Sequence, residues 1–185
     1  MIRCLITDGT ASRNEAPWLA RLACWMERGV DLIQIRERDL GARDLATLTR
    51  KVLALPNPQN TRILLNDRAD VALACGSHGV HLRDGSPGAE YFARPAFLVT
   101  VACHNIEQLP AISKADYVLL SPIFRGHSDE AVLGLKGLRE AALISPTPIL
   151  ALGGVTAGNE LECFAAGAAG IAGMSYFAIP SRDYK

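Results

Sequence analysis

The sequence predicts an α/β protein of the (β/α)8 barrel class, trimmed relative to typical examples, and three observations lead to this class. Short apolar runs alternate with segments of helical periodicity along all 185 residues. The runs are almost continuously apolar, which is typical of parallel strands that are covered on both faces. The turn after the first run, residues 7–10, lacks the glycine fingerprint that an open, doubly wound sheet carries there. We therefore expect a single closed barrel domain over residues 1–185.

Eight strands and seven helices are expected, in alternation. The strands are expected to begin near Ile2, Asp31, Arg62, Gly79, Phe97, Asp116, Pro148 and Gly170. The helices are expected at residues 17–28, 42–55, 69–75, 88–93, 106–113, 135–144 and 158–166. Only a short segment follows the last strand, which leaves little or no eighth helix. A second copy of the chain is one way to cover the surface left bare, so a homo-oligomer is a hypothesis.

The first two helices have the clearest signals. Pro17 suits the first turn of a helix, and Gly29 stands where a helix C-terminus needs a left-handed residue. In the second helix, apolar residues recur at helical spacing and form one buried face. These residues are Leu45, Leu48, Val52 and Leu55.

Composition excludes several classes of function. Lysine plus arginine and aspartate plus glutamate number 19 each, and a zero net charge argues against nucleic acid or an anionic membrane as partner. No apolar run approaches the roughly 18 residues that a spanning helix needs, and the N-terminus resembles a strand rather than a signal peptide. The five cysteines are scattered without CxxC spacing, which predicts buried reduced thiols and a cytoplasmic protein.

Polar residues at the ends of strands are candidates for a ligand site, because barrel sites lie at the C-terminal ends of the strands. In the second strand Gln34, Arg36 and Arg38 alternate, so all three point to one side. Two cations on one side need an anion, and the guanidinium fork suits phosphate. The sequence therefore predicts a site for a small phosphorylated ligand. The alternative is an internal ion-pair cluster with Asp8, Glu37 or Asp67.

The third, fourth and fifth strands also end in polar residues. Asn66 and Asp67 follow the third strand, where they suit a divalent cation, although Asp67 is also a candidate N-cap of the next helix. His81 and His104 end the next two strands and are candidates for proton transfer or for a structural role. His78 is expected in a surface loop.

Two glycine-bearing turns follow the seventh and eighth strands. Gly153 and Gly154 end the first turn, and Ser175 lies in the second. Barrels often bind phosphate with backbone N–H groups of these two loops. The alternative is that the glycines serve close packing.

At this point the chain resembles the thiamine phosphate synthases and their relatives, the TenI-type thiazole tautomerases. The segments that carry the resemblance are LITD (5–8), QIRER (34–38), LLNDRADVALACGSHGVHL (65–82), VACH (101–104), ADYVLLSPIF (115–124), ILALGGV (149–155) and GIAGMS (170–175). The resemblance implies a (β/α)8 barrel and a transferase of thiamine biosynthesis. This transferase joins hydroxymethylpyrimidine diphosphate to thiazole phosphate and releases pyrophosphate.

The resemblance also implies roles for residues. Gln34 and Arg36, with Arg38, would face the pyrimidine and the diphosphate, and Asn66 would bind on the diphosphate side. Asp67 would be a magnesium ligand. The remaining candidates are Asp84 as a second magnesium ligand, Gly153, Gly154 and Ser175 on the thiazole phosphate, and His81, His104, Arg125 and Ser128 along the substrates.

The chain departs from the family pattern mainly around the diphosphate. Arg38 replaces a lysine, Ser86 replaces a second magnesium-binding aspartate two residues after Asp84, and Ala102 replaces a serine. In the loop after the sixth strand, Gly126 and Ser128 stand in an altered motif, and Asp129 stands where a lysine is expected. Two other functions therefore stay open. One is a tautomerase that uses His81, His104 or His127, and the other is a non-catalytic barrel that binds thiazole or thiamine phosphate.

Overall fold

The computed structural model describes residues 1–125 and 131–178, and its centre is a closed barrel of eight parallel strands paired in chain order. The strands are β1 (Ile2–Ile6), β2 (Leu32–Ile35), β3 (Arg62–Asn66), β4 (Gly79–Leu82), β5 (Leu98–Cys103), β6 (Tyr117–Leu120), β7 (Ile149–Leu152) and β8 (Gly170–Gly173). Pairing of β8 with β1 closes the ring. The predicted barrel is confirmed, and every strand begins within one residue of its expected start.

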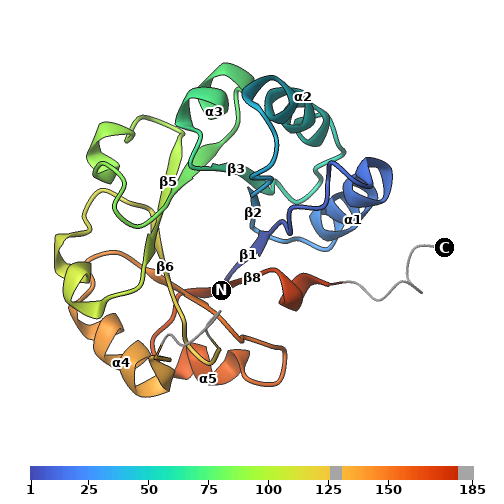
Figure 1. Cartoon of the computed structure of the whole chain (residues 1–185). Helices are drawn as coiled ribbons and strands as arrows, with labels where there is room; N and C mark the ends of the chain where they lie inside the picture. The colour runs from blue at the N-terminus through green and yellow to red at the C-terminus, as the bar shows by residue number, and fades with distance from the viewer. Residues whose placement is uncertain (126–130, 179–185) are drawn as a thin grey trace.

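The helices lie outside the ring of strands (Figure 1). The α-helices are α1 (Glu15–Glu27), α2 (Ala42–Leu53), α3 (Ala69–Cys75), α4 (Gly134–Ile144) and α5 (Glu160–Ala165). Two expected helices are wrong in type, because the segments after β4 and β5 form only the 3₁₀ helices η1 (Ala89–Tyr91) and η2 (Ile106–Ala111). Pro110 lies inside η2 and cannot donate a backbone hydrogen bond, which keeps that segment from continuing as an α-helix.

The start and end signals expected for the first helix are confirmed. Pro17 is the third residue of α1, and Gly29 follows the helix with a φ of 78°. Trp18, Leu22 and Met26 form the buried face of this helix. The apolar face of α2 likewise packs onto β2 and β3 in the same core cluster.

The barrel interior is filled by side chains of one strand parity. An apolar layer includes Cys4 and Ile6 of β1, Leu32 of β2 and Leu64 of β3. Residues of the same parity farther along the strands, such as Gln34 two residues after Leu32, rise above this layer. Because all strands run in the same direction, their polar residues come together at one end of the barrel, above the buried apolar layer.

The chain after β8 forms η3 (Ser175–Phe177), which docks on α1. Phe177 is 2% exposed, and its ring lies edge-on to Trp25 with 5.1 Å between ring centroids. The indole Nε1 of Trp25 donates to the carbonyl of Phe177 at 2.9 Å. Part of the surface that the missing eighth helix was expected to leave bare is thus covered by η3.

The five cysteines are free thiols, three buried and two half-buried. The burial expected of these thiols is found for Cys4, Cys103 and Cys163, whereas Cys24 and Cys75 are partly exposed. None of the helices within the described ranges is long and apolar enough to cross a membrane.

Candidate active site

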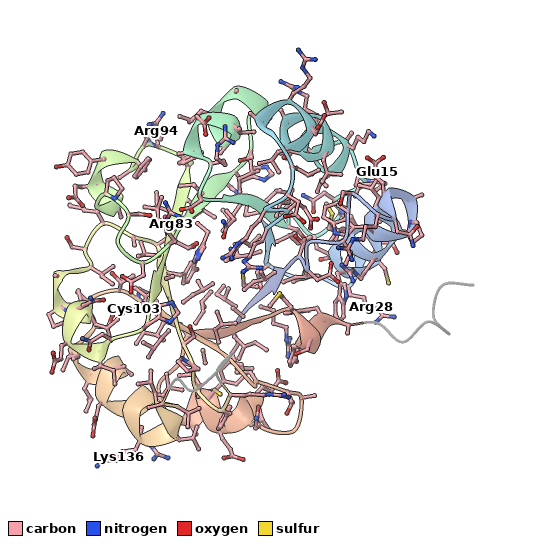
Figure 2. All side chains as sticks on the ribbon, in the orientation of Figure 1. Glu15, Arg28, Arg83, Arg94, Cys103 and Lys136 are labelled. Carbon is pink, nitrogen blue, oxygen red and sulfur yellow. The ribbon has the colours of Figure 1, made fainter. Side chains whose placement is uncertain are left out.

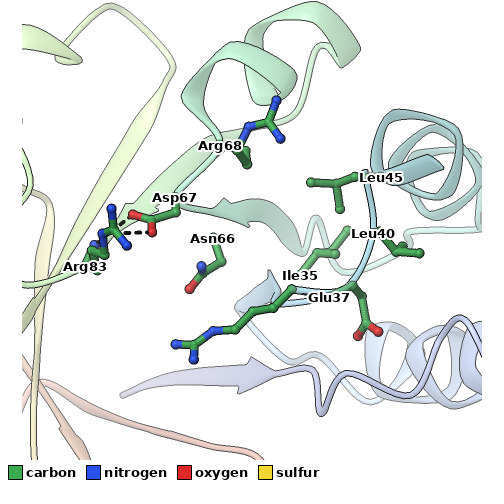
Figure 3. A pocket seen from close by; sticks show the side chains of 9 residues that line it. Ile35, Glu37, Leu40, Leu45, Asn66, Asp67, Arg68 and Arg83 are labelled. Atoms are coloured by element: carbon green, nitrogen blue, oxygen red, sulfur yellow. Dashed lines mark hydrogen bonds and ion pairs between the residues drawn. The ribbon is translucent and has the colours of Figure 1, made fainter. Parts of the chain in front are cut away.

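A cavity of about 380 Å³ opens at the C-terminal ends of the strands and gathers most of the predicted site residues. We call it the mouth cavity. Nine of the predicted residues line it, namely Gln34, Arg36, Arg38, Asn66, His81, Asp84, His104, Arg125 and Gly153. A neighbouring cavity of about 350 Å³ is lined by Arg38, Asn66, Asp67, Arg68 and Arg83, among others (Figure 3). Gly154 and Ser175 lie beside lining residues, and Ser128 falls outside the described residues together with Gly126, His127 and Asp129.

An amide pair spans β2 and β3 at the floor of the mouth cavity. Gln34 Nε2 donates to Asn66 Oδ1 at 2.9 Å, and Gln34 is 2% exposed. Gln34 Oε1 is buried and has no hydrogen-bond partner among the described residues. A buried carbonyl oxygen without a donor is costly, so this position favours a ligand that brings an N–H or O–H group.

Arg36 and Arg38 enter the mouth cavity without a carboxylate partner in the described part of the chain. The pKa of Arg36 is lowered, first because burial disfavours the charged form and then because Arg38 repels it, while Glu37 acts in the opposite direction. Two guanidinium groups at one strand end, without a carboxylate partner among the described residues, favour the binding of an anion.

The predicted alternative, an internal ion-pair cluster, is wrong because the three carboxylates are engaged elsewhere. Asp8 pairs with Arg21 at 2.9 Å, and Asp67 pairs with Arg83 at 3.2 Å. Glu37 accepts hydrogen bonds from the Thr7 hydroxyl and from two backbone N–H groups of the loop after β1.

Asp67 is fixed by backbone geometry and does not cap α3. It adopts a left-handed φ of 62°, and its N–H donates to the carbonyl of His81 at 2.8 Å. Arg68 holds the N-cap position of α3, and no side chain caps the helix. The capping alternative for Asp67 is therefore wrong, and its carboxylate faces Arg83, as Figure 3 shows.

The histidines differ in burial and therefore in chemistry. His81 is buried, with Nδ1 2.9 Å from the Thr100 hydroxyl, and its pKa is lowered to about 3 by burial and by repulsion from Arg36 and His104. A neutral ring with so low a pKa is a poor proton carrier near neutral pH. His104 is exposed, and its Nδ1 lies 3.1 Å from both oxygens of Ser121. His78, expected in a surface loop, is half-buried and its Nδ1 accepts the Ile63 N–H at 2.9 Å.

The glycine turn after β7 packs tightly on the loop after β6. Gly153 and Gly154 have φ values of 97° and 73°, and a Cβ on either would come within 2.9 Å of Arg125 atoms. Phe124 N–H donates to the Gly153 carbonyl at 2.8 Å. Close packing therefore accounts for both glycines, and it also sets their backbone beside the mouth cavity.

Two residues near the site carry contacts that the sequence pattern did not assign. Asn159 ties the β7 turn, because its Nδ2 donates to the Gly154 carbonyl at 3.1 Å and its Oδ1 accepts the Thr156 N–H at 2.8 Å. Arg83, just after β4, pairs with Asp67 just after the neighbouring strand β3. The sequence places Arg83 with His81 and Asp84 among the polar residues at the end of the fourth strand, but it does not indicate the partner of this arginine.

Comparison with known proteins places this geometry in a family. The family model described as "Thiamine monophosphate synthase" matches residues 3–177. The chain belongs to the thiamine monophosphate synthase family. This confirms the family that the sequence motifs indicated.

Relatives in this family are similar over most of their length. "Thiamine-phosphate synthase" of Methanoregula boonei is 38% identical over 181 residues, which cover 92% of this chain and 82% of the relative. The protein of the same name from Methanoculleus marisnigri is 37% identical over 180 residues, with 92% and 84% covered. A solved thiamine phosphate pyrophosphorylase from Pyrococcus furiosus aligns with a TM-score of 0.80 and 27% identity, covering 94% of this chain and 85% of that one.

Proposed function

We propose that this protein is a thiamine phosphate synthase, a transferase that joins hydroxymethylpyrimidine diphosphate to thiazole phosphate and releases pyrophosphate. Beyond family membership, one observation carries the proposal. Among the residues that the structure describes, four arginines line the mouth cavity and one carboxylate does, that of Asp84. The arginines are Arg36, Arg38, Arg83 and Arg125. Such an excess of guanidinium groups suits a diphosphate leaving group.

The reaction consists of one bond cleavage and one bond formation. The bond between the pyrimidine methylene carbon and the diphosphate oxygen breaks, and its electron pair leaves with pyrophosphate. The thiazole nitrogen then donates its lone pair to the methylene cation. No proton transfer is required, so catalysis depends on positioning and on stabilising the leaving charge. Arg36, Arg38, Arg83 and Arg125, which together we call the cationic rim, supply that stabilisation. The low pKa of His81 does not hinder the reaction, because no proton has to be transferred.

Gln34 is the residue that we assign to the pyrimidine. Its buried Oε1 lacks a donor within the described residues, and the amino group of the pyrimidine would supply one. Asn66 holds the amide through Oδ1, so that Gln34 Oε1 is directed away from Asn66. Arg36 lies two residues farther along the same face, where the diphosphate would follow.

The thiazole phosphate would bind between the turns after β7 and β8. Gly153 and Gly154 have no side chain to cover their N–H groups, and the Ser175 side chain is exposed in the adjoining turn. Asn159 is a positioning residue here, because it holds the Gly154 carbonyl and so orients the turn. His104 lines the same cavity.

Magnesium is the ion that membership in this family implies, and Asp67 and Asp84 are the carboxylates predicted to hold it. The arrangement of the described residues does not form a metal site by itself. Asp67 is paired with Arg83, and no group of three or more His, Cys, Asp or Glu side chains within residues 1–125 and 131–178 could hold a metal ion. The assignment of Asp67 and Asp84 stays a prediction.

Small phosphorylated substrates are the partners that we propose, and the cytoplasm is the compartment. Five free thiols suit a reducing compartment. A homo-oligomer stays a hypothesis.

The test is synthesis of thiamine phosphate by the purified protein from the two substrates, with the product oxidised to fluorescent thiochrome. We expect product in the wild type. Arg36→Ala should lower kcat by 100-fold or more, since a charge that stabilises the leaving group is lost, on the order of 3 kcal/mol. Arg94→Ala is the matched control, because this arginine lies on the outer surface (Figure 2) and should leave kcat unchanged.

Two other outcomes would contradict the proposal. No thiochrome, alongside isomerisation of the thiazole phosphate followed by NMR, would indicate a tautomerase that uses His104. Tight binding of thiazole phosphate without any turnover would indicate a binding protein.

A further inference from the structure

Arg83 stands at the carboxylate that is predicted to hold a metal ion. Its Nε lies 3.2 Å from Asp67 Oδ2, and its backbone N–H donates to Asp67 Oδ1 at 3.4 Å. The close-up in Figure 3 shows the guanidinium facing this carboxylate, whereas Arg68 points away from it. Both oxygens of Asp67 are therefore directed at one residue.

Asp67 and Arg83 differ in how many contacts hold them and in how far their side chains are exposed. Asp67 is anchored by its left-handed backbone and by its hydrogen bond to the His81 carbonyl, and its side chain is 26% exposed. The Arg83 side chain is 77% exposed. Such an exposed ion pair contributes little to stability, so a ligand can displace the guanidinium from the carboxylate, or share it, at small cost. The anchored carboxylate thus directs a guanidinium that is free to bind an incoming anion.

The place of Arg83 is central to the cationic rim. Arg83 and Arg38 each line both the mouth cavity and its neighbour. Figure 2 shows Arg83 toward the barrel mouth, whereas Arg94 and Lys136 lie on the outside of the molecule. Arg36 and Arg125 complete the rim. A diphosphate placed here meets several guanidinium forks, each able to bind two phosphate oxygens.

We propose that Arg83 takes the place of a divalent cation at Asp67, so that the protein binds a diphosphate group through guanidinium groups and without a metal ion. This inference rests on the proposed function, because pyrophosphate is the leaving group of that reaction. Arg83 acts as a binding residue, and Asp67 positions it.

The first experiment is calorimetric titration of the protein with inorganic pyrophosphate in excess EDTA. We expect the wild type to bind, Arg83→Gln to bind at least tenfold more weakly, and Arg83→Lys to fall between them because lysine keeps the charge but not the fork. The control Arg94→Gln should match the wild type. Thermal unfolding of each variant checks that the fold is intact.

The second experiment is titration of the same proteins with Mn²⁺, followed by electron paramagnetic resonance. We expect Arg83→Gln to bind Mn²⁺ at least tenfold more tightly than the wild type, because Asp67 becomes free for the ion. The double variant Arg83→Gln/Asp67→Asn should lose this gain.

Two results would overturn the inference. One is wild-type binding of pyrophosphate only when Mg²⁺ is added, with no effect of Arg83→Gln. The other is equal Mn²⁺ affinity in the wild type and Arg83→Gln. Either result leaves the thiochrome assay free to succeed, whereas metal-free pyrophosphate binding without thiochrome would reject the proposed function alone.

Discussion

His81 illustrates how burial decides what a single residue can do at the barrel mouth. Its ring lies in the interior beside the Thr100 hydroxyl, and Arg36 and His104 lie close enough to repel a positive charge on it. These surroundings lower its pKa from 6.5 to about 3. The neutral ring shapes the cavity floor and does not add a fifth cation to the four arginines.

The same residue predicts how stability depends on pH. Below pH 6.5 the unfolded chain protonates at this histidine while the folded chain does not, so stability should fall as the pH drops from 6.5 toward 3. At pH 5 the loss is about 2 kcal/mol. Urea denaturation at pH 7.5 and pH 5.0 measures this change in the free energy of unfolding. Between these two pH values, His81→Gln should lose about 2 kcal/mol less stability than the wild type.

His78 acts in the same pH window, because burial and the nearby charge of Arg62 lower its pKa from 6.5, but its contribution is common to the wild type and His81→Gln and cancels in their difference. The carboxylates act at lower pH. The pKa of Asp8, which Arg21 holds, is lowered from 3.8 to about 2, so its contribution is lost only below about pH 4. An equal pH dependence in the wild type and His81→Gln would contradict the assignment of this loss to His81.

At the scale of elements, the turn between β7 and α5 owes its shape to contacts from two sides. The loop after β6 packs against Gly153 and Gly154. Asn159, at the N-cap position of α5, makes no side-chain capping bond and ties Gly154 and Thr156 instead. An N-cap residue is thus used to set the geometry of a candidate phosphate loop.

Gly154→Ala tests this element. A Cβ at this position would lie 2.9 Å from Arg125 N and Cβ, with φ at 73°, so we expect a loss of about 1–3 kcal/mol in stability and a rise in KM for thiazole phosphate. The matched control is Gly158→Ala in the same turn, where the nearest atom is 3.7 Å away and φ is ordinary. Urea denaturation and steady-state kinetics provide the measurements, and equal behaviour of the two variants would refute this account of the turn.

In the whole molecule, the place where the last β/α unit meets the first is covered by η3. Within the described residues, no full helix follows β8. Phe177 contacts Trp25 and Tyr176, and its carbonyl accepts the Trp25 indole N–H. This contact joins the end of the last unit to the first helix, so it ties together segments that are distant in sequence.

Phe177→Ala should therefore lower the free energy of unfolding by about 3–5 kcal/mol, as for a buried aromatic residue. Tyr91→Ala is the control, because Tyr91 is 74% exposed and its loss should change stability little. Denaturant unfolding of both variants would decide, and a small loss at Phe177 would mean that η3 does not seal the barrel.

Local sequence patterns were enough to predict the barrel, the starts of its strands and most of the residues at its mouth. Apolar runs and strand-end polar residues are local patterns, and strand parity carries Gln34, Arg36 and Asn66 to one side without further information. The family motifs agree with this pattern. The sequence pattern did not predict that η1 and η2 would be 3₁₀ helices, because segments this short carry only weak periodicity.

Which charged side chains pair with one another could not be predicted from the sequence and depends on the folded arrangement. Asp8 binds Arg21, Glu37 binds the loop after β1, and Asp67 binds Arg83 across two strand ends. Charged side chains have several partners within reach of a strand end, and the register and loop geometry select one of them. The lack of a carboxylate partner for Arg36 and Arg38 within residues 1–125 and 131–178, and the pairing of Arg83 with Asp67, follow from that selection.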